Sequence, residues 1–141
     1  MTAAILPDEI RPVLDNGIPA VMVTCSAEGI PNVTVISQVY YVDPEHVALS
    51  FQFFNKTIRN VRENPRAFVC VNDVAGLAPW ILRLEFQRTE TEGAIFDAMD
   101  MQIEAIASAT GMSGIFKLRG ADIYRVLSVE RVAPPEAAVS R

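Results

Sequence analysis

Hydrophobic residues run through most of the chain in short apolar stretches or alternate with polar residues, and this pattern predicts six strands. The first two, at 18–26 and 31–42, flank a turn-forming segment at 26–29 and are expected to form a hairpin. The other strands are expected at 47–53, 66–72, 80–91 and 115–132. The strand at 31–42 is apolar on both faces, so a helix, a ligand or a second subunit must cover its outer face.

Three other segments carry apolar residues at helical spacing, which predicts helices at 7–14, 56–63 and 94–108. Pro65 ends the second helix, because proline disfavours a helical conformation in the residue before it. Antiparallel hairpins without strand–helix–strand alternation favour a closed or nearly closed barrel over a doubly wound sheet. The predicted fold class is therefore mainly β, with a few flanking helices.

The size and composition of the chain fit one domain with a substantial core. It has 141 residues, of which 50% are hydrophobic and 21% charged. Residues 1–6 and 133–141 are expected to be flexible tails. A net charge of −5 argues against general nucleic-acid binding. Without a signal peptide or a run of about 18 apolar residues, the chain is expected to be cytoplasmic and not membrane-bound.

The cysteines and the single histidine do not suggest a metal site. Cys25 and Cys70 each lie in an apolar run and lack metal-ligand spacing, so they are interpreted as reduced core residues. His46 follows Pro44 and Glu45 in a turn-like segment. We therefore expect no metal in this protein.

This acidic chain places four basic residues in one short segment: Lys56, Arg59, Arg62 and Arg66. Asn55 is a favoured helix N-cap, and the first turn of a helix offers free N–H groups and a positive dipole end. Lys56 and Thr57 would add a charge and a hydroxyl donor to this anion site. Arg59, one turn later, could join the site or reach solvent, whereas Arg62 lies further from the helix start. The alternative is that these charges form a solvated helix face.

Polar residues also interrupt the two neighbouring strands. Ser37 and Gln38 do so in one strand, and Ser50 and Gln52 in the next. An unpaired polar group in a half-buried strand costs about 1–3 kcal/mol, so each should have a partner. That partner is either a backbone or subunit-interface group, or the edge of a flat heteroaromatic ring.

Over most of residues 17–132, the chain resembles the pyridoxamine 5'-phosphate oxidase-like family of FMN-binding split barrels. The resemblance is carried by the opening hairpin, by the strand-to-helix segment VALSFQFFNKTIRNVRENPRAFV and by the late FKLRGADIYRV strand. Its most specific part is the N-K-T-x-R-N-x-x-x-N-P run. The resemblance implies a six-stranded antiparallel split β-barrel, the cofactor FMN, and a homodimer with FMN at the subunit interface.

The resemblance also implies a set of cofactor-binding residues. Ser37, Gln38 and Val39 would meet the isoalloxazine ring, Ser50, Phe51 and Gln52 would lie beside the ring and ribityl chain, and Asn55, Lys56 and Thr57 would hold the phosphate, with Arg59 able to join. From the partner subunit, Lys117, Arg119 and Trp80 could approach the cofactor. These residues form the predicted site.

True vitamin B6 oxidases are longer and carry a basic C-terminal motif. This chain ends in RVLSVERVAPPEAAVSR and lacks an Arg-x-His pair there. The expected function is therefore that of an FMN-dependent oxidoreductase of unknown substrate, with no catalytic residue assigned. The alternatives are a flavin- or haem-binding sensor or carrier without turnover, and a dimeric structural module.

Overall fold

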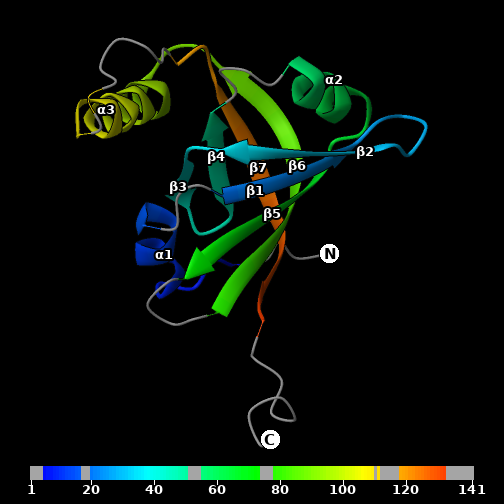
Figure 1. Ribbon diagram of the computed structural model, residues 1–141, viewed down its shortest axis with the longest axis horizontal. Coiled ribbons are helices and arrows are strands. Elements are labelled where there is room, and N and C mark those ends of the chain that lie inside the picture. Colours follow the sequence, from blue (N-terminus) through cyan, green and yellow to red (C-terminus); the bar gives the residue numbers. More distant parts are fainter. Residues whose placement is uncertain are drawn as a thin grey trace, which may run out of the picture.

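The computed structural model describes residues 5–16, 20–50, 55–73, 78–109, 111 and 118–132. Seven strands and three helices lie in this part of the chain (Figure 1). In chain order they are α1 Ile10–Asn16, β1 Ala20–Cys25, β2 Pro31–Ile36, β3 Val39–Asp43, β4 His46–Ser50, α2 Asn55–Glu63, β5 Arg66–Asp73, β6 Ala78–Glu90, α3 Ala94–Ala109 and β7 Ala121–Arg131.

The strands form one antiparallel sheet in the order β2-β1-β5-β6-β7-β4-β3. The predicted fold class, an antiparallel split barrel with flanking helices, is confirmed. The strand count differs by one because the predicted strand at 31–42 is divided at Ser37 and Gln38 into β2 and β3. Since β2 pairs with β1 and β3 pairs with β4, the two halves lie at opposite edges of the sheet.

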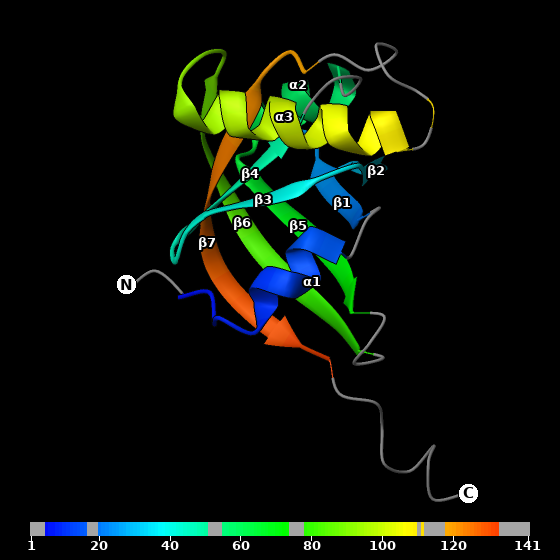
Figure 2. The same cartoon turned by 90° about the vertical axis from the view of Figure 1, so that its left-hand side faces the viewer.

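The core fills the inner face of the sheet, where Met22, Val69 and Leu82 are almost fully buried. The apolar side of α1 packs into the same core. Figure 2 shows α3 lying across one end of the sheet, where Met99 and Ile103 belong to a second cluster. Both helices were predicted, within three residues at each boundary.

Of the two predicted tails, the structure describes only residues 5 and 6. Residues 1–4 and 133–141 lie outside the described residues. Leu6 is buried in the core, and its amide donates to the carbonyl of Pro44 at 2.7 Å. No helix in the described part of the chain is long and apolar enough to cross a membrane.

The outer face of β1 and β2 leaves apolar side chains exposed. Val33 and Val35 are 66% and 57% exposed, and Val35 lies opposite Val21 in the register. Cys70 pairs with Val21 across β1 and β5 and is half-buried, between the buried Val69 and Val71. The interpretation of Cys70 as a core residue is therefore wrong for the single chain, because strand alternation turns it to the outer face.

Candidate functional site

Helix α2 presents two different faces to its surroundings. Thr57, Asn60 and Val61 are buried, at the i, i+3, i+4 spacing of one helix face. Lys56 and Arg59 are exposed. Helix α2 begins at Asn55, one residue before the predicted start at 56, where Asn55 was expected as the N-cap. The side chain of Asn55 lies outside the described part of the structure. The buried face of α2 contacts β1 and β2.

Two side-chain hydrogen bonds fix α2 against these strands. Asn32 Nδ2 on β2 donates to Thr57 Oγ1 at 3.3 Å, and Asn60 Nδ2 donates to Thr24 Oγ1 on β1 at 3.1 Å. A threonine hydroxyl can accept and also donate. Thr57 therefore retains a proton that it can give to an anion at the start of α2.

Sequence reasoning missed Asn32, Asn60 and Thr24. The sequence did contain a signal for Asn60. It follows Thr57 by three residues, which places both side chains on one face of a helix whose other face is charged. Asn32 and Thr24 carried no comparable signal, since their partners lie 25 and 36 residues away in the sequence.

The far end of β2 carries the second group of predicted residues. Ser37 Oγ and Ser50 Oγ are 3.5 Å apart, with Ser37 exposed and Ser50 buried. Gln38 is only 3% exposed, and Val39 is buried in the main core cluster. The structure thus brings Ser37, Gln38, Val39 and Ser50 together at the junction of β2 and β3.

The amide of Gln38 is only partly satisfied. Its Nε2 donates to Gln102 Oε1 on α3, whereas its Oε1 is buried without a partner among the described residues. Buried polar atoms are nearly always hydrogen-bonded, so this oxygen indicates a missing donor.

Strand β2 connects the two ends of the candidate site. Five residues separate Asn32 from Ser37, which is about 17 Å in an extended strand. A ligand that touches both ends must therefore be elongated, with an anionic group near α2 and polar atoms near the β2–β3 junction.

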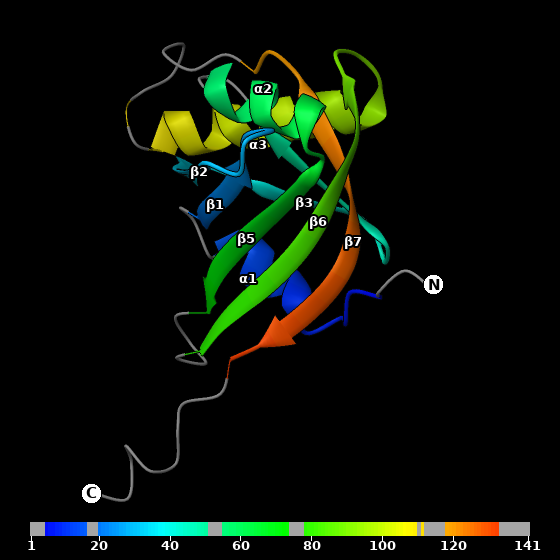
Figure 3. The same cartoon turned by 90° about the vertical axis from the view of Figure 1, so that its right-hand side faces the viewer.

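Of the remaining predicted residues, only Trp80 and Arg119 lie in the part of the chain that the structure describes. Phe51, Gln52 and Lys117 lie outside the described residues. Figure 3 shows α2 at one end of β5 and the start of β6 at the other. Trp80 lies near that start and is buried, opposite Val71, so it is remote from α2. Arg119 is exposed.

One of the basic residues has a carboxylate partner, and another acts on a buried carboxyl through its charge alone. Burial raises the pKa of Asp122 to about 6, while a 2.6 Å hydrogen bond from Thr89 and the charge of Arg62 act in the opposite direction. Arg66 Nε lies 3.5 Å from Glu85 Oε2. Arg66 is thus paired with an acidic residue, and Arg62 lies in the last turn of α2, away from the start of that helix.

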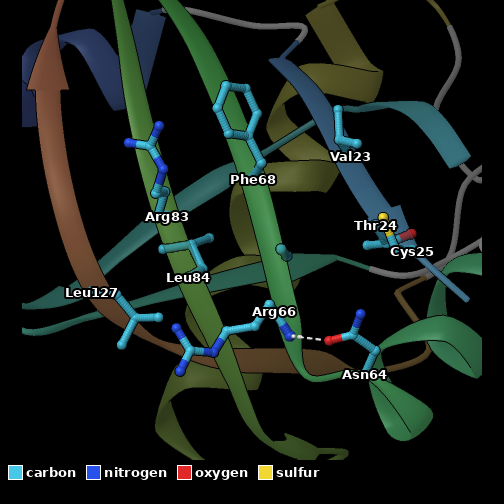
Figure 4. Close-up of a pocket in the computed structure, with 10 residues that line it drawn as sticks. Val23, Thr24, Cys25, Asn64, Arg66, Phe68, Arg83, Leu84 and Leu127 are labelled. Carbon is cyan, nitrogen blue, oxygen red and sulfur yellow. Dashed lines mark hydrogen bonds between the residues drawn. The ribbon is translucent and has the colours of Figure 1, made fainter. Parts of the chain in front are cut away.

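Arg66 also lines a pocket of about 280 Å³ on the outer face of the sheet, at the C-terminal end of α2 (Figure 4). Arg83 lies over the ring of Phe68 there, 5.8 Å from its centroid. Arg83 is also 3.6 Å from Glu130. Since both arginines of this pocket already face a carboxylate, it is a weaker anion site than the start of α2.

A second pocket of about 260 Å³ adjoins the β2–β3 junction. It is lined by Gln38 together with residues of α1 and α3: Leu14, Asp15, Gln102, Ala105 and Ile106. The described residues contain no group of three or more His, Cys, Asp or Glu side chains placed to hold a metal ion.

The family model for pyridoxamine 5'-phosphate oxidase matches residues 6–126. The chain belongs to the pyridoxamine 5'-phosphate oxidase family. This confirms the resemblance inferred from the N-K-T-x-R-N-x-x-x-N-P segment, which forms α2 and its approach to β5. No curated protein matches the chain significantly.

Solved structures share the fold at low sequence identity. An FMN-binding protein from Syntrophomonas wolfei subsp. wolfei is 15% identical, with a TM-score of 0.71 over 90% of each chain. An F420 reductase is 14% identical, with a TM-score of 0.64 over 89% of this chain and 98% of its own. HutZ, the haem storage protein from Vibrio cholerae, is 14% identical, with a TM-score of 0.59 over 89% of this chain and 94% of its own. These similarities establish the split-barrel fold and leave the ligand to be argued from the site.

Proposed function

We propose that this member of the pyridoxamine 5'-phosphate oxidase family binds FMN along β2, as part of a flavin-dependent oxidoreductase. The observation that carries the proposal is the arrangement of polar groups at the two ends of that strand. Thr57 lies against Asn32 at one end, and Ser37 lies against Ser50 at the other. This spacing suits an elongated cofactor with a phosphate and a polar ring.

The phosphate is assigned to the start of α2. The free N–H groups of the first turn and the helix dipole favour an anion there. The Thr57 hydroxyl can donate to a phosphate oxygen from a buried position, and Lys56 can approach from the exposed face. Arg59 is also exposed, one turn further along, and is a secondary candidate.

The isoalloxazine ring is assigned to the β2–β3 junction. Ser37 and Ser50 can each donate or accept hydrogen bonds at the edge of a flavin ring. When bound, FMN supplies hydride or electron transfer. The residues described above bind it, orient it and shield part of it from water.

The active unit is proposed to be a homodimer. Val21, Val33 and Val35 form a contiguous exposed apolar strip on β1 and β2. Covering a strip of this kind with a second copy is favourable, because it removes apolar surface from water. Trp80, which the sequence offered as a contribution of the second copy, is buried within its own chain and is left out of the proposed site.

A haem-binding carrier is the second candidate. His46 Nδ1 lies 2.9 Å from Asp43 Oδ1, a pairing that orients an imidazole so that its other nitrogen can bind a metal. The fold is shared with the haem storage protein HutZ. This arrangement favours haem over a purely structural role. His46 begins β4, however, whereas Ser50 of the elongated site ends that strand.

Reconstitution of the purified protein separates these functions. Saturable FMN binding, followed by reduction with NADH or NADPH and reoxidation by an acceptor, supports an oxidoreductase. FMN binding without reduction by NADH or NADPH supports a carrier. The flavin proposal is contradicted if the protein does not bind FMN but binds haemin with a Soret shift, and if that shift is lost in His46→Ala.

A further inference from the structure

Asn32 contacts the proposed phosphate site from a different element than the residues assigned to that site. It is the second residue of β2, and α2 lies against the β1–β2 hairpin (Figure 1). The half-buried side chain of Asn32 reaches Thr57 on α2, with 3.3 Å between Asn32 Nδ2 and Thr57 Oγ1. Through this contact the hairpin reaches the first turn of the helix.

The chemistry of the two groups fixes the direction of this hydrogen bond. An amide nitrogen donates and cannot accept, so Thr57 Oγ1 is the acceptor. A hydroxyl has one proton, and that proton then remains available for another partner. If β2 presented an acceptor at this position instead, the hydroxyl would donate to it and would have no proton left for an anion.

Burial makes the orientation of the Thr57 hydroxyl depend on the protein. Thr57 is 5% exposed, whereas Lys56 and Arg59 lie on the exposed face of α2. Water therefore has little access to the hydroxyl, and the groups packed around it decide where its proton points. Within the described ranges, the side chain hydrogen-bonded to Thr57 is that of Asn32.

A second asparagine–threonine hydrogen bond lies beside the first. Thr24 is opposite Asn32 in the β1–β2 register, and Thr24 Oγ1 accepts from Asn60 Nδ2 at 3.1 Å. Thr57 and Asn60 share the buried face of α2. Both hydrogen bonds attach α2 to the hairpin, but only the bond from Asn32 ends on a residue assigned to the phosphate. The two asparagines therefore separate attachment of the helix from orientation of the hydroxyl.

We propose that Asn32 is a positioning residue of the phosphate site. Its amide occupies an acceptor position of Thr57 Oγ1 and so directs the hydroxyl proton toward a phosphate oxygen. Asn32 acts through Thr57 and does not itself contact the ligand. This inference rests on the proposed function, because the phosphate in question is that of FMN.

The test compares FMN with riboflavin in wild type and in Asn32→Leu, a variant of similar size that lacks the amide. The ratio of the two affinities, measured by flavin fluorescence, isolates the phosphate contribution. Asn32→Leu is expected to weaken FMN binding about two- to tenfold and to change riboflavin binding by less than about twofold. The loss should be smaller than that of Thr57→Val, because the hydroxyl is still present. If Asn32→Leu does not fold, Asn32→Ala takes its place.

Two comparisons separate positioning from other roles of Asn32. In a Thr57→Val protein no hydroxyl remains to be oriented, so adding Asn32→Leu should cost less than about twofold more in FMN affinity. Asn60→Ala is the matched control, since it removes the neighbouring hydrogen bond between α2 and the hairpin. It should change the ratio of FMN to riboflavin affinity by less than about twofold.

The inference is overturned by any of three results in folded proteins. Asn32→Leu may bind FMN as tightly as wild type does, its effect may add in full to that of Thr57→Val, which would mean a direct contact with the ligand, or Asn60→Ala may lower the affinity ratio equally, which would mean that attachment of α2 is the cause.

Failure of the flavin proposal is seen separately, with inorganic phosphate followed by phosphorus NMR. Phosphate binding that Asn32→Leu weakens, in a protein that does not bind FMN, supports the positioning role and contradicts the flavin assignment. A protein that binds neither FMN nor inorganic phosphate contradicts both proposals.

Discussion

Replacing Thr57 by Val and Lys56 by Ala is expected to weaken FMN binding while leaving riboflavin binding nearly unchanged. Riboflavin carries the same ring and ribityl chain but no phosphate, so the ratio of the two affinities isolates the phosphate contribution. Both side chains lie at the start of α2, but they differ in burial.

The burial of each side chain sets the expected magnitude. Thr57 is buried, and a hydrogen bond to a charged group is worth about 1.5–3 kcal/mol, so Thr57→Val should cost about 10- to 150-fold in FMN affinity. Lys56 is exposed, and an exposed ion pair is worth about 0.2–1 kcal/mol, so Lys56→Ala should cost about 1.5- to 5-fold. The smaller side chain is thus expected to matter more.

The assay is a titration of flavin fluorescence against apo-protein at fixed ionic strength, with circular dichroism to check folding. Arg88→Ala is the matched control, because Arg88 is an exposed cation paired with Glu90 on β6. The reasoning is refuted if a folded Thr57→Val protein binds FMN as tightly as wild type. Equal losses for FMN and riboflavin would also refute it, because the effect would then not concern the phosphate.

Three further predictions concern stability and assembly. Asp122→Asn should remove a pH dependence of the unfolding free energy. Burial raises the pKa of Asp122 to about 6, so the folded protein binds a proton at this carboxyl more readily than the unfolded chain does. The unfolding free energy of wild type should therefore fall by about 2–3 kcal/mol relative to the variant as pH rises from about 4 to 7. Urea unfolding of both proteins across that range measures this, and parallel curves would show that Asp122 titrates normally. Asn60→Ala should lower the unfolding free energy by about 1–3 kcal/mol, because it leaves the hydroxyl of Thr24 buried without its donor, whereas Arg59→Ala on the exposed face should change it by less than about 0.5 kcal/mol. An unchanged urea midpoint in Asn60→Ala would count against the role given to that hydrogen bond. Val33→Lys should convert the proposed dimer to a folded monomer in size-exclusion chromatography with light scattering. Met101→Lys changes an exposed apolar residue on α3 and should leave that dimer intact. A dimeric Val33→Lys protein would place the second copy elsewhere.

The sequence predicted most elements because their apolar periodicity is strong. The stripe on α3 and the strand alternation of β5 and β6 were read at nearly their observed boundaries. The division of residues 31–42 into β2 and β3 was not predicted. Apolar residues continue on both sides of Ser37 and Gln38, and only the pairing partners, β1 on one side and β4 on the other, require the chain to cross between sheet edges there.

The candidate site was predicted less completely than the fold. Helix capping and dipole arguments pointed to Lys56 and Thr57 because they depend only on local sequence. The contact between Gln38 and Gln102 joins residues 64 positions apart, and no local pattern indicates it. Burial of Asp122 likewise follows from the pairing of β7 with β4 and β6, which no local pattern indicates.

A crystal structure of the protein with FMN is the most direct test of the proposed cofactor site. The phosphate is predicted to lie within hydrogen-bonding distance, about 3 Å, of the first-turn N–H groups of α2 and of Thr57 Oγ1. The ring is predicted to lie beside Ser37 and Ser50. Density for the phosphate in the outer pocket of Arg66 and Arg83 (Figure 4), or the absence of FMN at saturating concentration, would contradict the assignment.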